Sequence, residues 1–268
     1  MITLRQFPDM RYSGRLGNNL YELAALIGLA DSMGEKVILP TGWIYQPYFN
    51  LPDDMFGEVP PDAREATDWA GHIEGRVRIF LQDINFFKDS LPKIREYFKP
   101  SALAQPYVDK CSEFWELPRP VLSIHVRRGD LTDDPVMPDK TLYYTVPKED
   151  FYRRAINQLK PGMASVAIFS DGIDWCKERF DADYFHEGTP YRHLTDPDFM
   201  IATPYDWIDL HLMAACERHL VGGSTFGIWG ALMADDKEAL YQRPVYGPAY
   251  SFIDESLLFL PSWKALDV

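Results

Sequence analysis

The chain has 268 residues, of which 46% are apolar and 25% are charged, and its formal net charge at pH 7 is −13. This composition is typical of a globular protein with one large domain or two small ones, and nothing in it suggests disorder. So acidic a chain is a poor partner for nucleic acid, whose phosphates select basic surfaces. A small phosphorylated ligand, by contrast, needs only a local cationic pocket.

The three cysteines are scattered and show neither a C-x-x-C motif nor a pairing pattern. Such sparse cysteines are typical of a reduced compartment. The first residues lack the apolar core of a signal peptide, and no stretch reaches the ~20 apolar residues that a membrane span needs. We therefore expect a cytoplasmic, soluble protein with no transmembrane segment, for which peripheral association with a membrane stays open.

The first part of the chain is expected to form an α/β domain, residues 1–117. Hydrophobic periodicity predicts, in order, a strand at 2–7, a glycine-rich turn at 14–19, a helix at 20–33 and a strand at 36–39. Residues 40–90 are irregular and rich in proline and aromatic residues, which is typical of a long loop system that shapes a pocket. Helical patterns return around 94–98 and 103–115.

Pro118 and Pro120 interrupt the helical pattern and mark a domain boundary near residue 117. Beyond it, apolar runs alternate with helical patterns, which predicts a parallel sheet covered by helices on both faces. The expected strands are 121–126, 165–169, 184–185, 219–221 and 239–241, and the expected helices are 148–159, 173–180, 205–216 and 226–233. The predicted fold class is therefore α/β, with a second domain at 118–268.

The apolar run at 121–126 ends in His125, Arg127, Arg128 and Asp130. A guanidinium presents a planar fork of donors that suits phosphate oxygens, and ligands of open α/β sheets bind at the carboxyl ends of strands. This cluster therefore predicts a phosphate site. The alternative is a surface ion-pair network between either arginine and Asp130, and His125 taken alone fits a buried core histidine better.

Two further strands end in polar residues. Asp171 could accept hydrogen bonds from a base or a ribose, and alternatively Ser170 or Asp171 could be the N-cap of the next helix. Ser224 and Thr225 follow two glycines and precede a helix, where backbone N–H groups and hydroxyls can hold a phosphate. Phe226 takes the last glycine position of G-x-S-x-G, which argues against a serine hydrolase. The turn at 14–19 either lets a ligand approach the backbone or is purely structural.

Metal binding has little support in the sequence. The pairs Asp181/Asp183 and Asp196/Asp198 could bind a divalent ion with a diphosphate, but an acidic chain produces such pairs easily. The histidines show no H-x-x-x-H spacing for zinc. The residues together predict a nucleotide diphosphate held by arginines and a helix N-terminus, without a metal.

The sequence resembles the α-1,2-fucosyltransferases of glycosyltransferase family 11. The family pattern H-x-R-R-x-D is met by His125, Arg127, Arg128 and Asp130, and segments 14–24, 169–171 and 209–231 resemble three further family motifs in the same order. The chain departs from the pattern at Asn19, where glutamine is usual, and at Gly227–Ile228, which replaces a serine-aromatic pair.

The resemblance implies a GT-B-like fold of two Rossmann-type domains facing a cleft, with the acceptor side in 1–117 and the GDP-fucose site in 118–268. It implies an inverting, metal-independent transfer of fucose from GDP-β-L-fucose to O2 of a galactose-containing oligosaccharide acceptor, with no cofactor. A GDP-fucose transferase of other linkage (α-1,6 or O-fucosyl), a nucleotide-sugar-binding protein without catalysis and a metal-dependent transferase stay open as alternatives.

The resemblance also implies roles for single residues. Arg128, or its neighbour Arg127, would neutralise the departing diphosphate, and Asp130 would belong to the same catalytic group. The implied donor-binding residues are His125, Ser170 and Asp171 for the nucleoside, Ser224, Thr225 and Phe226 for phosphate, and Gly17, Asn18 and Asn19 at the cleft. The catalytic base is Asp130, Asp133, Asp134 or Glu22, and the sequence does not choose between them.

Overall fold

The computed structural model describes residues 1–7, 15–68, 80–132, 140–188, 205–235 and 238–268. The chain divides into two compact units, of which unit 1 comprises 1–106 and 256–260 and unit 2 comprises 107–255 and 261–268. No helix among the described residues is both long and apolar enough to cross a membrane.

Unit 1 is built around the helix α2 (Leu16–Met33), which is buried along most of its length and ends at Gly34 in a left-handed conformation. Beside it, β1 (Ile2–Thr3) pairs in parallel with β2 (Arg64–Glu65), and single parallel bridges join Ile2 to Val37 and Leu39 to Phe56. The predicted strand at 2–7 is thus reduced to Ile2–Thr3, and the predicted strand at 36–39 is wrong, because Val37 and Leu39 form only isolated bridges. The remaining elements are α4 (Leu91–Tyr97), the start of α5 (Gln105–Asp109), and 3-10 helices at Gln46–Tyr48, Asp53–Met55, Ala66–Asp68, Ile84–Phe86 and Lys88–Ser90.

The aromatic residues of the irregular region form much of the core of unit 1. The ring of Trp43 stacks on Phe49 with centroids 5.8 Å apart and on Phe56 at 6.3 Å. Trp43 and Phe49 are both buried. These rings therefore supply the apolar interior that so short a sheet cannot supply by itself.

Unit 2 contains, among its described residues, a six-stranded parallel sheet with the order β5-β4-β3-β6-β7-β8. Its strands are β3 (Val121–Val126), β4 (Ser165–Ser170), β5 (Tyr184–Glu187), β6 (Arg218–Val221), β7 (Glu238–Arg243) and β8 (Lys264–Asp267). If the six strands are renumbered 1 to 6 along the chain, their order in the sheet is 3-2-1-4-5-6, which is the order of dinucleotide-binding sheets. Strands 2 and 3 are added on one side of strand 1 and strands 4 to 6 on the other, and the switch point is the place between strands 1 and 4 where this order reverses. Here that switch point lies between β3 and β6. The predicted α/β class with a parallel sheet is confirmed.

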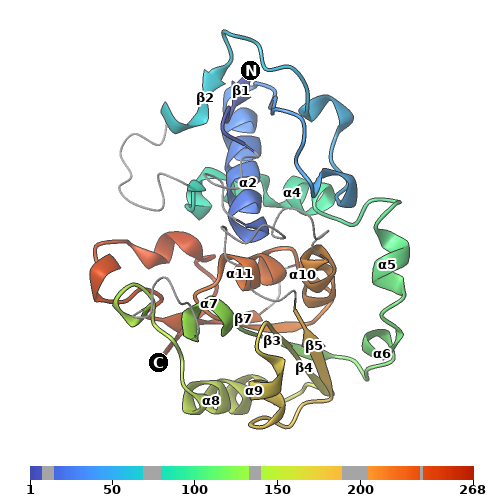
Figure 1. The fold of residues 1–268 in the computed structure, drawn as a ribbon, viewed down its shortest axis with the longest axis vertical. Helices are drawn as coiled ribbons and strands as arrows, with labels where there is room; N and C mark the ends of the chain where they lie inside the picture. Colours follow the sequence, from blue (N-terminus) through green and yellow to red (C-terminus); the bar gives the residue numbers. More distant parts are fainter. Residues whose placement is uncertain (8–14, 69–79, 133–139, 189–204, 236–237) are drawn as a thin grey trace. The chain divides into compact units, whose positions relative to one another are not determined.

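Helices cover both faces of this sheet, with α8 and α9 on one side and α10 and α11 on the other (Figure 1). The described helices of unit 2 are the end of α5, α6 (Ser112–Trp115), α7 (Gly129–Thr132), α8 (Glu149–Leu159), α9 (Ile173–Lys177), α10 (Asp206–Ala214) and α11 (Thr225–Leu232). Unit 2 also contains 3-10 turns at Lys140–Leu142 and Pro248–Tyr250. A further 3-10 turn, Glu255–Leu258, begins in unit 2 and ends in unit 1. The neighbouring strands β3 and β4 are buried at every position. Leu122, Ile124 and Val126 pack with the apolar face of α8, so the alternate residues, His125 among them, face α11.

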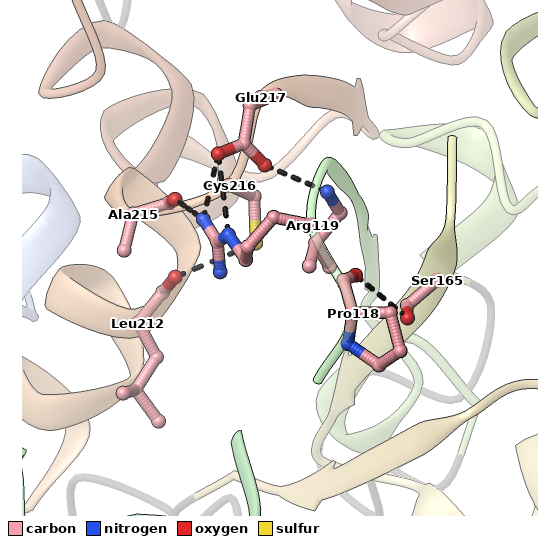
Figure 2. Close-up of polar contacts among 8 residues, drawn as sticks. Pro118, Arg119, Ser165, Leu212, Ala215, Cys216 and Glu217 are labelled. Atoms are coloured by element: carbon pink, nitrogen blue, oxygen red, sulfur yellow. Dashed lines mark hydrogen bonds and ion pairs between the residues drawn. The ribbon is translucent and has the colours of Figure 1, made fainter. Parts of the chain in front are cut away.

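The amino ends of β3 and β6 are joined by Glu217, the residue before β6 (Figure 2). Its carboxylate accepts hydrogen bonds from the backbone N–H of Val121 at 2.6 Å and from the guanidinium of Arg119 at 2.9 Å. Arg119 also donates to the carbonyl of Ala215. This group of bonds helps to set the register of the two strands whose carboxyl ends carry the candidate site.

The boundary between the units differs from the one expected at residue 117, because the segment after Pro106 packs with unit 2. The Phe114 ring lies 6.2 Å from the Phe169 ring of β4 and 5.5 Å from the Tyr184 ring of β5. The predicted turn at 14–19 is also wrong in its described part. Helix α2 already begins at Leu16, which places Gly17, Asn18 and Asn19 in its first turn.

Candidate functional site

Three of the predicted motifs meet at the carboxyl edge of the sheet in unit 2. Residues 127–130 follow β3, Asp171 follows β4 and Ser224 follows β6, and these three strands are neighbours in the sheet. Ligands of open α/β sheets bind at this edge, beside the switch point. The structure therefore brings the arginine motif and the small-residue turn together, as the sequence predicted.

A narrow crevice opens at this edge, with a volume of about 10 Å³. It admits a single group of the size of a water molecule or a phosphate oxygen, so a larger ligand would enter it with one end only. Its walls come from the segments after β3, β6 and β7 and from the start of α8: Arg127, Leu131, Tyr144, Thr145, Pro147, Tyr152, Gly222, Gly223, Ser224, Gln242 and Val245.

The two adjacent arginines have different surroundings. Arg127 lines the crevice, and its guanidinium carbon Cζ lies 5.8 Å from the centre of the Tyr144 ring. The guanidinium of Arg128 instead lies over the indole of Trp175 in α9, with Cζ 4.3 Å from the ring centre. Of the two side chains, only that of Arg127 shares the crevice with Ser224.

Asp171 and Ser170 hold the turn between β4 and α9. The Asp171 carboxylate accepts a hydrogen bond of 2.6 Å from the backbone N–H of Arg128, and the buried Ser170 hydroxyl accepts one of 2.9 Å from the N–H of Gly172. Neither residue caps α9, because the N-cap residue of that helix is Gly172 and no side chain caps it, so the helix-capping alternative is wrong. Both residues thus have structural contacts, and their role toward a nucleoside stays a prediction.

His125 is buried against the first turn of α11. Its ring centre lies 5.6 Å from that of Phe226, and a Cβ atom placed on Gly227 would stand 2.5 Å from its Nδ1. Within the described residues Nδ1 has no hydrogen-bond partner. Burial, and to a lesser degree the charge of Arg127, lowers the pKa of His125 to about 3, so the imidazole is neutral near pH 7. The core-histidine alternative fits this position better than a cationic phosphate contact.

The N-terminus of α11 presents donors to the same edge. Ser224 is the residue before the helix, and its side chain makes no capping bond. The first helical backbone bond runs from the N–H of Ile228 to the carbonyl of Ser224, so the preceding N–H groups of the first turn have no partner within the helix. Such a turn favours an anion. Thr225 and Phe226, the first two residues of α11, are partly exposed here.

Gln242 supports this edge and was missed by sequence reasoning. Its side chain is fully buried in β7. The Oε1 atom accepts a hydrogen bond of 3.1 Å from the N–H of Gly223, while Nε2 donates to the carbonyls of Thr145 at 2.8 Å and Pro244 at 3.1 Å. The amide thus fixes the turn after β6 to two other walls of the crevice.

A second polar group that the sequence did not indicate lies at the carboxyl end of β5. The His186 ring bonds through Nε2 to the Asp209 carboxylate and through Nδ1 to the Tyr184 hydroxyl, both at 2.8 Å. Burial raises the pKa of Asp209, and the hydrogen bond from His186 opposes that shift. Nothing in a single sequence pairs residues of α10 and β5 in this way.

The other predicted site residues lie in unit 1 or outside the described residues. Asn19 Oδ1 accepts a hydrogen bond of 3.0 Å from Trp43, Asn18 Oδ1 accepts one of 2.9 Å from Gln82, and Glu22 is buried in α2. Their place at a donor cleft, like that of Gly17, stays a prediction. Outside the described structure lie Asp133, Asp134 and the side chain of Asp130, whose backbone belongs to α7.

Metal ligands do not gather in the part of the chain that the structure describes, where no three His, Cys, Asp or Glu side chains form a group suited to an ion. Of the two Asp-x-Asp pairs, Asp196/Asp198 falls on undescribed residues. In the other pair, the Asp183 carboxylate accepts a hydrogen bond of 2.8 Å from the N–H of Val166. That carboxylate is engaged at the amino end of the sheet, opposite the candidate site.

Comparison with known proteins identifies the family. The model of glycosyl transferase family 11 matches residues 104–267. Galactoside alpha-(1,2)-fucosyltransferase 1 of Homo sapiens is 26% identical, over 95% of this chain and 73% of that protein. Galactoside alpha-(1,2)-fucosyltransferase 2 of Mus musculus is 25% identical, over 94% and 76%. An alpha-1,2-colitosyltransferase of Escherichia coli is 25% identical, over 60% and 52%.

Among solved structures, NodZ alpha-1,6-fucosyltransferase soaked with GDP-fucose aligns with a TM-score of 0.42 at 14% identity, covering 87% of this chain and 90% of that one. The family match spans more than half of the sequence and includes the whole six-stranded sheet with the candidate site. The chain therefore belongs to glycosyl transferase family 11 and is a glycosyltransferase.

Proposed function

We propose that this protein is a fucosyltransferase that transfers L-fucose from GDP-β-L-fucose to O2 of a galactose-type acceptor, with inversion and without a metal. The main support for the donor site is that Arg127 and Ser224 line the same crevice, at the N-terminus of α11 and beside the switch point of the sheet. The names of the aligned relatives support the sugar and the linkage.

The diphosphate of the donor would bind across the end of β3 and the start of α11. Arg127 offers a guanidinium fork to phosphate oxygens, and Ser224 and the N–H groups of the first helical turn add neutral donors. The net charge of −13 gives the rest of the chain no general affinity for an anion, so this local group must supply it. His125 is neutral at pH 7, so it contributes to the shape of the donor site and not to its positive charge.

The same groups would assist the reaction. The acceptor O2 attacks the anomeric carbon of fucose as the bond from that carbon to the β-phosphate oxygen breaks, and the configuration inverts. Negative charge then develops on the leaving GDP, where Arg127 and the helix N-terminus can stabilise it, and one such electrostatic clamp is typically worth ~3 kcal/mol. The proton of O2 passes to a carboxylate base, for which Asp130, Asp133, Asp134 and Glu22 are the candidates.

The test is transfer from GDP-fucose to lactose and to N-acetyllactosamine, in the presence of EDTA, with GDP-mannose as the control donor. We expect a fucosylated product from GDP-fucose only, with NMR showing substitution at O2 of galactose. Product at another position would support the α-1,6 or O-fucosyl alternative. GDP binding without product from any galactoside would favour a binding protein, and loss of activity in EDTA would refute metal independence.

A further inference from the structure

We infer that Trp175 is a positioning residue for this transferase: its indole holds Arg128, and so directs the neighbouring Arg127 toward the diphosphate. The inference rests on the donor site proposed above and adds to it a residue that contacts no part of the substrate. It follows from the contacts of the two arginines and of the turn between β4 and α9.

The contact between Arg128 and Trp175 is a cation–π interaction at short range. The Cζ atom lies 4.3 Å from the ring centre, well inside the ~6 Å over which such contacts are attractive. The indole is itself fixed, because its ring packs edge-on against Phe180 at 5.5 Å and Tyr152 at 6.2 Å. Arg128 thus lies on a rigid surface.

The backbone and the aliphatic part of Arg128 are held by the same turn. Its N–H donates to Asp171 at 2.6 Å, and the turn is closed by the bond of 2.9 Å from Gly172 N–H to Ser170. A Cβ atom on Gly172 would stand only 2.7 Å from Cβ of Arg128, so the side chain passes directly over the glycine. Three separate contacts therefore fix the conformation of this arginine.

The indole of Trp175 is the main partner of the Arg128 guanidinium, because this guanidinium forms no ion pair among the described residues. A second arginine, Arg179, also lies over Trp175 at 4.9 Å, but it forms ion pairs with Glu178 at 2.7 Å and Glu149 at 3.8 Å. Among the described residues the guanidinium of Arg128 has no such pair.

The orientation of Arg127 follows from that of Arg128. Successive side chains of an extended segment point to opposite sides, and the two arginines leave β3 one after the other. Because Arg128 is fixed on the α9 side, Arg127 turns the other way, into the crevice with Ser224. If Trp175 is lost, the Arg128 guanidinium loses its aromatic support although its backbone stays bound to Asp171, and we expect Arg127 to bind phosphate less well as a result.

The experiment measures GDP binding by isothermal titration calorimetry for the wild type, Trp175→Leu, Trp175→Phe, Arg128→Met and the double variant Trp175→Leu/Arg128→Met. We expect Trp175→Leu to raise the Kd for GDP about tenfold, the size expected for loss of a partly buried cation–π contact. Trp175→Phe keeps an aromatic face and should raise the Kd less than threefold. Trp115→Leu, at a partly exposed tryptophan elsewhere in unit 2, is the matched control and should bind GDP as the wild type does.

The double variant separates positioning from general packing. If Trp175 acts through Arg128, the double variant should bind GDP no more than about twofold more weakly than the weaker single variant. If the factors by which the two single substitutions raise the Kd for GDP multiply in the double variant, the inference is overturned while the donor site is left intact. Wild-type affinity for GDP in a folded Trp175→Leu variant would have the same meaning. If Trp175→Leu does not fold, a Trp175→Phe that binds as weakly as Arg128→Met would overturn it as well. A wild type that fails to bind GDP would refute the proposed function, and this inference with it.

Discussion

Replacing Gln242 by Glu exchanges one buried Nε2 donor group for an oxygen of nearly the same shape. The amide donates to the carbonyls of Thr145 and Pro244 and accepts from Gly223, so the network fixes which atom is nitrogen. An ionised carboxylate would face both carbonyls without a proton. Two lost bonds that leave buried acceptors unsatisfied cost about 1–3 kcal/mol each, so we expect the free energy of unfolding to fall by about 2–6 kcal/mol at pH 7.

The loss should depend on pH, which distinguishes it from a packing defect. Burial beside two carbonyls raises the pKa of the introduced carboxyl above its ordinary value near 4.3. The unfolded variant then releases its proton at lower pH than the folded one, so the variant loses stability as pH rises, by at most ~1.4 kcal/mol per pH unit. At pH 5 the protonated acid can donate to one carbonyl, and the deficit against wild type should shrink.

Urea unfolding of the wild type, Gln242→Glu and Gln242→Met at pH 5, 6 and 7 measures this effect. Gln242→Met removes both the donor and the acceptor without adding a titrating group, so its deficit should stay constant across the series. A Gln242→Glu deficit below about 1 kcal/mol at pH 7, or one as large at pH 5 as at pH 7, would show that the two amide hydrogen bonds do not hold the walls of the crevice together.

Four further substitutions give independent checks. Gly227→Ala should destabilise the protein by about 1–3 kcal/mol in chemical denaturation, because the new Cβ would stand 2.5 Å from the His125 ring, whereas helix propensity alone predicts a gain of about 1 kcal/mol. The pKa of His125 falls to about 3 on folding, so the contribution of the neutral imidazole to the free energy of unfolding is complete above pH ~6.5. As the pH falls below this value the contribution is lost, by at most ~1.4 kcal/mol per pH unit. His125→Asn should remove that part of the pH dependence in chemical denaturation. Ser224→Ala should weaken GDP binding only about threefold, because first-turn N–H groups remain, whereas Arg127→Gln should weaken it about 100-fold; equal losses in calorimetry would contradict the assignment.

The sheet of unit 2 could be predicted from the sequence where strands are continuous apolar runs. The strands β3 and β4 are buried at every position, and their predicted bounds differ from the observed ones by at most one residue. The strand β8 was missed, because Lys264–Asp267 is short, carries charge at both ends and has no fully buried position. The start of α2 was missed because Gly17 and two asparagines suggested a turn, although a first helical turn tolerates them.

The location of the candidate site could be predicted from the sequence, but the orientations and contacts of its side chains could not. Parallel strands bring their carboxyl ends to one edge, and so the motifs after β3 and β6 had to meet. Arg127 lines the crevice, whereas Arg128 lies over Trp175 of α9, and no periodicity in the sequence indicates that contact. For the same reason the hydrogen bonds of Gln242 could only be seen in the fold.

The proposed donor site requires that Arg127 and the start of α11 bind the diphosphate of the donor. The most direct measurement compares the affinities of the wild type and Arg127→Gln for GDP, GMP and guanosine by calorimetry at fixed ionic strength. We expect the wild type to bind GDP far more tightly than guanosine, and Arg127→Gln to remove most of this difference while leaving the weak affinity for guanosine unchanged. Equal affinity of the wild type for GDP and guanosine, or an undiminished preference for GDP in Arg127→Gln, would contradict it.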